Sequence, residues 1–598
     1  YLGLEDHEEA LLELQRAVSF VGGKSKSAAD VSADQDKHAI QEIDIRVAEA
    51  EALFGLSKHV EAADKLNYLM SNPRMKADDH LPTLLLYAKI CLIYAKWSDC
   101  VRSLLRAIAA NQNDRTAKKL LVEALKCPDG FKELAVQIPS GPQSGSVFAF
   151  LGVIARDESA FALGIRLLGM ALEGHPQNAN FALTLIHLHE SNNDLVSALE
   201  VMKRFLINNS SARVTYGAKQ LHSGFSCGEL ANVIDLALNS TLGAIASSDI
   251  IRWNTTEDDA PTDPTAPSDP NSGYGEVLSA DGSAVTRTHD PTLGGAAAAT
   301  DATLDLFAIA FTAVKILYVR GQLAYLPQII RVVEPSRRDY QKVLKTSVHE
   351  TSIRNEHAYY LCIVQAYDPL LIDRWLRNRP ENIAGGKVPN DNVIYVVGDS
   401  HCMSPAWSTI NVQAGQGAPK TYTLVPKLVT GLKHWHLRPE SRFYPKASFW
   451  STMASIADGS KVIFMLGEID CREGLLRAVE KDAYPNLESS MKRTSGIFAD
   501  VLKSIIKSKP NLKVFIHPIV PVLDPTRKIV IKYNTVLRKA VSTIRGVVWI
   551  DIFEEMLRDP IREANHTGIN IVGGESVDVL KLKESFQFDG THIHPNYV

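Results

Sequence analysis

The C-terminal third of the chain contains serine, aspartate and histidine residues of the types that catalyse acyl transfer. Gly398-Asp399-Ser400-His401 follows a short apolar run, and Asp589-Gly590-Thr591-His592 lies close to the end of the chain. A serine where a strand turns into a helix is exposed and lies near unpaired backbone N–H groups, as a nucleophile requires. An aspartate three residues before a histidine can hold one imidazole tautomer while the other ring nitrogen faces a hydroxyl. Either motif alone also occurs as a structural turn or a surface pair, but their combination points to serine chemistry.

A third motif, Gly467-Glu468-Ile469-Asp470-Cys471-Arg472, follows another apolar run. With it, the order of motifs resembles the SGNH (GDSL-like) hydrolase superfamily, which has a Gly-Asp-Ser block after its first strand and an Asp-x-x-His block near its C-terminus. The resemblance covers about residues 392–598. Position by position, it implies that Ser400 is the nucleophile, His592 the general base and Asp589 the acid that orients the base.

The resemblance also implies an oxyanion hole to which Ser400 contributes its backbone N–H. We expect Asp399, Gly467 and Asp470 to support the site, with no cofactor and no metal. The family carries Asn in its third block, where this chain has Ile469, and Ile cannot donate to an oxyanion. The loss of one such donor typically reduces the rate by roughly 10²–10³-fold.

Arg472 is the residue that we expect to replace the missing donor, because a guanidinium beside a forming oxyanion would stabilise it strongly. The alternative is that Arg472 pairs with Glu468 or Asp470 and only braces the loop. Gly431 is our choice for the glycine of the family's second block, with Gly415 and Gly417 as competitors.

Four further histidines lie in this part of the chain. His434 and His436 can line a substrate pocket, or they can face solvent or satisfy their ring nitrogens within the core, and the solvent-facing or core hypothesis is favoured. His517 follows an apolar run and can either face the site or be a buried, hydrogen-bonded residue. His594 precedes Pro595, which restricts the local backbone, and we interpret it as structural.

Short apolar runs that alternate with helical patterns indicate how these motifs are positioned. The runs are Val393–Val397, Val462–Leu466, Val514–Pro518 and Val547–Asp551, and the helical patterns include Asn486–Lys507 and Arg527–Ile544. Buried strands alternating with helices predict a parallel sheet covered on both faces, a three-layer α/β domain. Active sites in such sheets lie beyond the carboxyl ends of the strands, and we expect all three motifs to lie at such ends.

The N-terminal part of the chain reads as consecutive helices with a repeat of about 34 residues. Small or apolar residues recur at the same offsets in the units that begin at Leu81, Gly145 and Ala179, as shown by Ala88 and Cys100, Gly152 and Gly164, and Ala198. Small residues let two helices cross closely, and larger ones fill the groove to the next pair. The spacing resembles degenerate tetratricopeptide repeats over about residues 1–212, and the alternative is an α-helical solenoid without family identity.

The domain organisation that we predict has four parts. Helical repeats occupy residues 1–253, a disordered acidic and Pro/Ala-rich insertion 254–302, further repeats 303–385, and the hydrolase-like domain 392–598. The insertion cannot bury enough apolar surface to offset its ordering entropy. Leu304, Phe307 and Phe311 begin one apolar helix face after it.

Composition limits the partners of the chain. The 598 residues have a net charge of −4 without a basic stripe, which argues against nucleic acid, and no apolar stretch reaches the ~20 residues of a membrane span. Seven widely spaced cysteines without a CxxC pair argue against disulfides and zinc and favour a reducing compartment, so we expect a cytoplasmic protein. The chain begins with Tyr1 inside a helical pattern, which is compatible with a further N-terminal segment.

Two functions fit these observations. The first is a serine esterase or acyltransferase acting on an ester, with the repeats as a scaffold for a protein partner. The Gly-Asp-Ser-His form is similar to SGNH domains associated with polysaccharide O-acetylation, which suggests an O-acetylated saccharide as substrate. The second is a non-catalytic scaffold whose hydrolase-like domain is degenerate at Ile469. A glycosyltransferase fits worse, because no Asp-x-Asp metal motif lies near a strand end.

Overall fold

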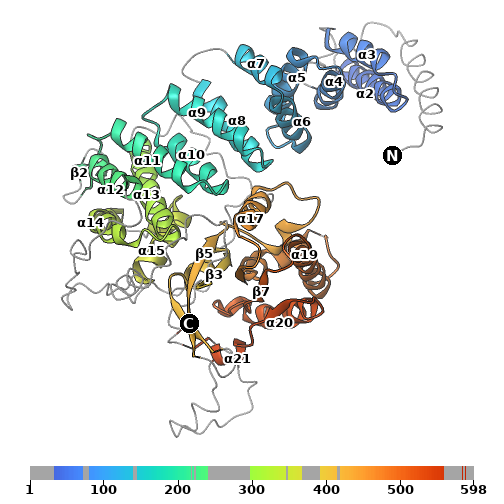
Figure 1. Cartoon of the computed structure of the whole chain (residues 1–598). Coiled ribbons are helices and arrows are strands. Elements are labelled where there is room, and N and C mark those ends of the chain that lie inside the picture. Colours follow the sequence, from blue (N-terminus) through green and yellow to red (C-terminus); the bar gives the residue numbers. More distant parts are fainter. Residues whose placement is uncertain are drawn as a thin grey trace. The chain divides into compact units, whose positions relative to one another are not determined.

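The computed structural model combines helices in the N-terminal half with a six-stranded sheet in the C-terminal part, as expected (Figure 1). The residues that it describes are 33–71, 80–138, 144–213, 215–216, 219–220, 224–239, 296–344, 348–366, 391–413, 418–481, 483–557, 582–583 and 586. Asp589, His592, His594, Gly415 and Gly417 lie outside these residues. The chain divides into two compact units, Tyr1–Gly174 and His175–Val598.

The first unit consists of helices that pack in consecutive pairs. The described helices are α2 (Ala33–Gly55), α3 (His59–Ser71), α4 (Leu81–Ile93), α5 (Trp97–Ala110), α6 (Arg115–Lys126), α7 (Pro128–Gln137), α8 (Ser144–Asp157) and α9 (Phe161–Gly174). The contacts join α2 to α3, α4 to α5, α6 to α7 and α8 to α9. The helical part of the prediction is therefore confirmed for the described residues of this unit.

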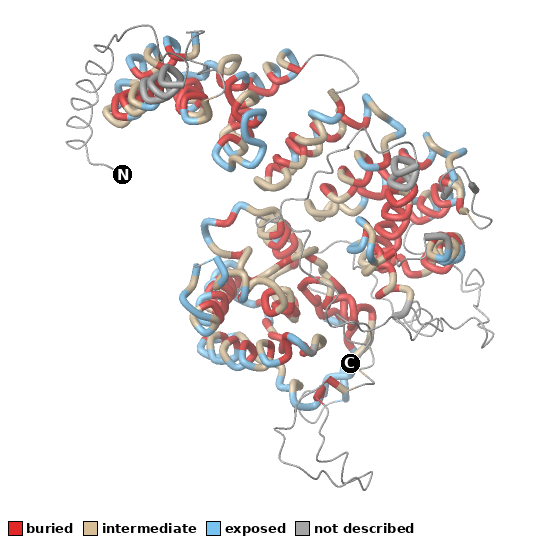
Figure 2. Tube along the Cα trace, turned by 180° about the vertical axis from the view of Figure 1, so that it is seen from behind, coloured by how far each residue is buried: buried red, intermediate tan, exposed pale blue. Residues whose placement is uncertain are grey.

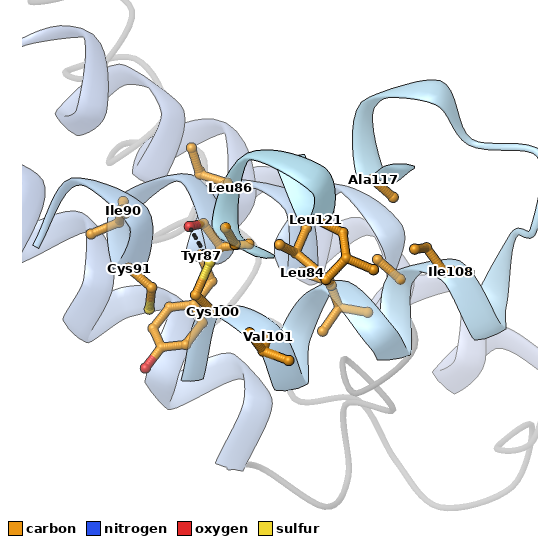
Figure 3. Packing of buried hydrophobic residues seen from close by; sticks show 14 of the residues in the cluster. Leu84, Leu86, Tyr87, Ile90, Cys91, Cys100, Val101, Ile108, Ala117 and Leu121 are labelled. Atoms are coloured by element: carbon orange, nitrogen blue, oxygen red, sulfur yellow. Dashed lines mark hydrogen bonds between the residues drawn. The ribbon is translucent and has the colours of Figure 1, made fainter. Parts of the chain in front are cut away.

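Small residues lie where the helices of a pair cross. In α8 and α9, a Cβ on Gly152 would lie 2.7 Å from Leu168 Cγ and 3.3 Å from the carbonyl oxygen of Gly164. In α4 and α5, the thiol of Cys100 lies 3.6 Å from the carbonyl oxygen of Ala88, within the apolar core that Figure 3 shows. The close approach expected from the spacing of these residues is present in both pairs.

The second unit begins with more helices of the same kind. They are α10 (Ala179–Ser191), α11 (Leu195–Asn208) and α12 (Cys227–Asn239), with a short antiparallel pair of strands, β1 (Thr215–Tyr216) and β2 (Lys219–Gln220), between the last two. Three further helices follow: α13 (Ala296–Val319), α14 (Leu326–Leu344) and α15 (Arg354–Ala366). Helix α13 begins inside the segment 254–302 that we expected to be disordered, and residues 254–295 lie outside the described part.

Four helix pairs turn at a residue in the left-handed backbone region. Ser57, Ala95, Ser159 and Asn193 have φ between 54° and 61°, and each lies two residues before the second helix of its pair. None of the four is glycine, which adopts this conformation most readily. The turn geometry thus repeats with the helices, although its sequence signal is weak.

Helix α13 is buried around almost its whole circumference. We had expected burial along one face only. Nearly every residue from Thr303 to Tyr318 is buried, including Lys315. Figure 2 shows this part of the chain mostly in red, the colour of buried residues. The helix contacts α10, α11, α12, α14 and α15, and also strand β5 of the sheet. It is therefore the central helix of this unit.

The sheet has the order β4-β5-β3-β6-β7-β8. Its strands are β3 (Val393–Gly398), β4 (Thr409–Val412), β5 (Lys420–Leu428), β6 (Lys461–Met465), β7 (Lys513–Ile516) and β8 (Val547–Trp549). Five strands are parallel, but β4 is antiparallel to β5, so the sheet is mixed and not purely parallel as predicted. After β3, the chain forms β4 and β5 on one side of β3 and then β6, β7 and β8 on its other side. The strand order therefore reverses between β3 and β6.

The helices of the α/β part lie around this sheet (Figure 1). They are α17 (Tyr444–Ser455), α18 (Leu475–Glu480), α19 (Leu487–Ser508), α20 (Arg527–Val541) and α21 (Phe553–Met556). Among the helices that the structure describes, none is both long and apolar enough to cross a bilayer.

The helices of the second unit meet the α/β part through a buried aromatic contact. Trp407 is 1% exposed, and its indole N–H donates to the carbonyl oxygen of Tyr318 at 2.8 Å. In return, the hydroxyl of Tyr318 donates to the carbonyl oxygen of Met403 at 3.1 Å. Helix α13 is thereby hydrogen-bonded to the turn that follows β3.

Candidate functional site

The register of the sheet brings three loops together at its carboxyl edge. Gly398, the last residue of β3, is paired with Leu428 of β5 and with Met465 of β6. The chain continues from these residues into the β3 turn (residues 399–404), the β5 loop (429–437) and the β6 loop (466–474). Ser400, Gly431, Gly467, Asp470 and Arg472 all lie in these loops. They therefore lie where sheets with this strand order bind ligands.

Gly398 is required by a close approach of backbones. A Cβ at this position would lie 1.9 Å from the carbonyl oxygen of Met465, and the φ of Gly398 is not positive. The approach of β3 to β6, and not a special backbone conformation, is therefore the reason for this glycine. Gly467 does have a positive φ, of 115°, and its Cβ would lie 2.8 Å from Cε1 of His434.

Ser400 is half-buried between two buried residues. It begins a short 3-10 helix, Ser400–Met403, which Asp399 caps. Asp399 Oδ1 accepts a hydrogen bond from the backbone N–H of His401 at 3.0 Å and lies 3.0 Å from His401 Nδ1. The Asp399 carboxylate thus fixes the turn and pairs with His401, while Ser400 remains partly accessible.

Asp399 and His401 form a buried ion pair. Burial raises the pKa of Asp399, but the charge and hydrogen bonds of His401 outweigh this effect and lower that pKa below its usual value. Burial lowers the pKa of His401, and the charge and hydrogen bond of Asp399 outweigh it and raise that pKa. The pair therefore favours the protonated form of His401 beside Ser400.

Arg472 has acidic partners in its own loop. Its guanidinium lies 3.6 Å from Glu468 Oε2 and 3.6 Å from Glu473 Oε1, and the side chain is 26% exposed. This geometry matches the bracing alternative for Glu468. Arg472 still acts on the site electrostatically, because its charge helps to lower the pKa of Asp399.

Asp470 connects the β6 loop to the β5 loop. Its Oδ2 accepts the backbone N–H of His434 at 2.7 Å, and its Oδ1 accepts that of Trp435 at 3.2 Å. Lys433 and Glu473 make a second connection between the loops, at 3.1 Å. The Asp470 carboxylate is thus an anchor for the β5 loop and not a partner of Arg472.

Burial raises the pKa of Asp470 to about 7, against the opposing effect of the two backbone N–H donors. Folded protein therefore binds a proton between about pH 4 and 7 that unfolded protein releases, and stability falls as the pH rises through this window. The pKa of Asp470 is about 3 higher in the folded protein than in the unfolded one. At ~1.4 kcal/mol for each step of one in pKa, the stability lost across this window is about 4 kcal/mol.

An Asp470→Asn variant is expected to lose this dependence, because its side chain stays neutral. Urea unfolding of both proteins at a series of pH values measures the effect. The variant should gain stability relative to the wild type as the pH rises from 4 to 7. A difference between the two proteins that stays constant over that range would contradict the assignment.

Two of the histidines are buried core residues. His434 packs on Phe498 with ring centroids 4.3 Å apart, its Nδ1 lies 3.0 Å from the hydroxyl of Tyr533, and burial lowers its pKa to about 3. His517 donates from Nδ1 to the carbonyl oxygen of Pro518 at 2.7 Å. Burial lowers the pKa of His517 to about 4, and the nearby charge of His401 also lowers it. His434 is therefore a buried core residue, although its Nε2 has no hydrogen-bond partner among the described residues, and His517 is both buried and close to the site.

Gly431 in the β5 loop has a backbone conformation that only glycine adopts readily. Its φ is 67°, and a Cβ would meet no atom within 4 Å, so the conformation and not the space requires glycine. Thr430, directly before it, lies with its hydroxyl 3.5 Å from Glu190 Oε1 of α10. His436 packs on Phe443 with ring centroids 5.0 Å apart.

Several residues near the site were missed by the sequence analysis. Tyr359 on α15 hydrogen-bonds with Thr430, and burial, Glu190 and Asp399 all raise its pKa. The β6 loop contains a π-helical turn, Asp470–Gly474, a feature that is frequent at functional sites. One signal for this cluster was present in the sequence: Lys315 is the lone charged residue of the stretch Phe307–Val319, and its ammonium pairs with Glu190.

The described residues include no group of three or more His, Cys, Asp or Glu side chains that could hold a metal ion. Comparison of the sequence with protein-family models and with curated proteins finds no match. The assignment of a function therefore depends on the geometry at the carboxyl edge of the sheet.

Proposed function

We propose that the chain is a serine esterase or acyltransferase of the SGNH type, with Ser400 as its nucleophile. The observation that carries this proposal is the position of Ser400, half-buried at the carboxyl end of β3, where the strand order reverses. The triad is completed by His592 as general base and Asp589 as its orienting acid. Both roles come from the motif order alone, because these two residues lie outside the described part.

The Asp399–His401 pair has a different role from the triad. Asp399 Oδ1 is engaged with both the ring and the backbone N–H of His401. The pair therefore shapes the β3 turn and aims the backbone N–H groups at the start of the 3-10 helix. A cationic His401 beside Ser400 also favours negative charge as it develops on a tetrahedral intermediate.

The oxyanion hole of this proposal consists of the backbone N–H of Ser400, the β5 loop at Gly431 and the positive charge of Arg472. The pairing of Arg472 with Glu468 and Glu473 weakens its contribution as a direct donor. Ile469 is half-buried, and its side chain supplies no donor. The enzyme would then be slower than one with an Asn in this position by up to roughly 10²–10³-fold.

The substrate class that we propose is an O-acylated saccharide or a related ester, on the strength of the Gly-Asp-Ser-His motif. The helices of residues 33–174 expose several large apolar side chains, and we propose that they bind a protein partner. These exposed residues are Val60, Tyr68, Ile93, Tyr94, Val136 and Val147. All seven cysteines are free thiols, which supports a reducing, cytoplasmic location.

Labelling with a fluorophosphonate probe, together with hydrolysis of p-nitrophenyl acetate, tests the proposal. The wild type is expected to be labelled, and Ser400→Ala is expected to lose labelling and roughly 10⁶-fold in kcat if the triad acts as in other serine hydrolases. Ser408→Ala is the matched control, because Ser408 is also half-buried but follows the β3 turn.

Equal labelling of the wild type and Ser400→Ala would assign the nucleophile elsewhere. An inert wild type that still forms a stoichiometric complex through its helices would favour the scaffold function. The observation that favours this second function is the pairing of Arg472 with Glu468, because it weakens Arg472 as a replacement for the missing Asn donor.

A further inference from the structure

The β5 loop is held in place from two directions. From the sheet side, Asp470 accepts the backbone N–H groups of His434 and Trp435. From the helix side, the contact is at Thr430, whose hydroxyl lies 3.5 Å from Glu190 Oε1 and hydrogen-bonds with Tyr359. The loop is therefore fixed by α10 and α15, which begin at Ala179 and Arg354, as well as by the β6 loop.

Glu190 and Lys315 form a buried pair behind Thr430. The Lys315 ammonium lies 2.6 Å from Oε1 and 2.9 Å from Oε2 of Glu190, and the two side chains are 4% and 12% exposed. Glu190 lies in the last turn of α10, where the helix dipole disfavours a negative charge, so Lys315 compensates for an unfavourable position. A buried pair contributes little net stability, and its best-attested use is to specify one arrangement.

Tyr359 completes this cluster. The ammonium of Lys315 lies 4.8 Å from the centre of the Tyr359 ring, so the ring is held by a cation–π contact. The phenol stays protonated, because burial together with the charges of Glu190 and Asp399 raises the pKa of Tyr359 well above its ordinary value. Its hydroxyl is thus available as a neutral partner for Thr430.

We infer that Glu190, Lys315 and Tyr359 are positioning residues of the acyl site. They hold Thr430, and through it the backbone of Gly431, in the arrangement that an oxyanion hole requires. Helices α10, α13 and α15 are therefore part of the catalytic unit and not only a platform for a partner protein. This inference rests on the proposed function, in which Gly431 contributes to the oxyanion hole.

A pair of adjacent tyrosines provides a matched test in the full-length chain. Tyr359→Phe removes the hydroxyl that contacts Thr430 and keeps the ring over Lys315. Tyr360→Phe makes the same change one residue later, where the hydroxyl donates to Glu334 of α14 at 3.0 Å. Tyr359→Phe is expected to lower kcat roughly tenfold with KM nearly unchanged, and Tyr360→Phe to leave kcat unchanged.

Hydrogen exchange of the β5 loop gives a second readout that does not depend on activity. Backbone amides of residues 429–432 are expected to exchange faster in Tyr359→Phe than in the wild type, and at the wild-type rate in Tyr360→Phe. Faster exchange in a chain that proves inert would support the positioning role while the proposed function fails. Wild-type exchange in Tyr359→Phe, or faster exchange with wild-type kcat in an active enzyme, would overturn the inference.

The charged pair is tested by a double substitution. Glu190→Gln or Lys315→Met alone leaves one buried charge unpaired and should lower the unfolding temperature. The double variant removes both charges and should recover that temperature while kcat stays low, because Thr430 has lost its carboxylate partner. Recovery of kcat together with stability would show that the pair is only structural.

Discussion

An alanine in place of Gly398 is expected to destabilise the α/β part of the chain by about 3 kcal/mol or more. Its Cβ would lie 1.9 Å from the carbonyl oxygen and 2.8 Å from the carbonyl carbon of Met465, and both atoms belong to the backbone of β6. A flexible side chain could rotate away from such a contact, but a strand paired on both sides cannot. The ends of β3 and β6 would have to separate, and Ser400 and the β6 loop would move with them.

Urea unfolding of the full chain, together with fluorophosphonate labelling, measures this effect. Gly496→Ala in α19 is the control, because a Cβ there would meet no atom within 4 Å. Alanine in that helix should raise stability by up to ~1 kcal/mol. A Gly398→Ala protein with a wild-type midpoint and wild-type labelling would show that the approach of β3 to β6 is looser than described.

Replacement of Asp399 by asparagine should produce the second large loss. Asp399 and His401 are 0% and 4% exposed, and the carboxylate is the partner of His401 Nδ1. Removing one partner of a buried ion pair typically costs ~3–5 kcal/mol, since the other charge remains without compensation. Asparagine keeps an oxygen that can cap the turn, so the loss reports on the charge.

The pH dependence of this loss follows from the two pKa directions. The contribution of Asp399, whose pKa is lowered, is present above about pH 4 and disappears as the pH falls through that lowered pKa. The contribution of His401, whose pKa is raised, is complete below about pH 6.5 and disappears as the pH rises through the raised pKa. The difference between wild type and variant should therefore be largest between about pH 4 and 6.5.

Unfolding midpoints from pH 3 to 9 would trace this profile. Asp551→Asn is a matched control, because Asp551 pairs with Arg538 at 2.9 Å but the two side chains are 64% and 54% exposed. That exposed pair is expected to contribute no more than ~1 kcal/mol at any pH. An equal effect of the two substitutions would show that the Asp399–His401 pair is not buried in solution.

The sequence was most informative where burial on both faces produces a continuous apolar run. The four runs expected as strands became β3, β6, β7 and β8, with ends shifted by at most two residues. Strands β4 and β5 were missed, and Pro426 shows why. A proline inside a run normally argues against a central strand. Strand β4 pairs only with residues 420–423 of β5, and Pro426 lies beyond them. The edge of β5 that faces β4 has no partner strand at Pro426, so the missing N–H breaks no hydrogen bond of the sheet there, while the other edge still pairs with β3.

The candidate site could be predicted only as far as it follows from strand ends. Ser400 and the β6 loop were located because each follows an apolar run directly. The bond from Asp470 to the backbone of His434, and the contact of Glu190 with Thr430, join segments that are distant in sequence. Local patterns contain no information on such pairs, because tertiary packing alone brings them together.

The left-handed residue at the corner of each helix pair bears on how this array can evolve. Ser57, Ala95 and Ser159 each close a turn between two helices that pack on one another. Such a hairpin carries its own corner and packs on its neighbours in one continuous core, so a duplicated copy would add one more unit to the array. The pair α10–α11 is different, because Glu190 is committed to Lys315 and Thr430. Its gene segment is therefore tied to that of the α/β part, which contains Thr430.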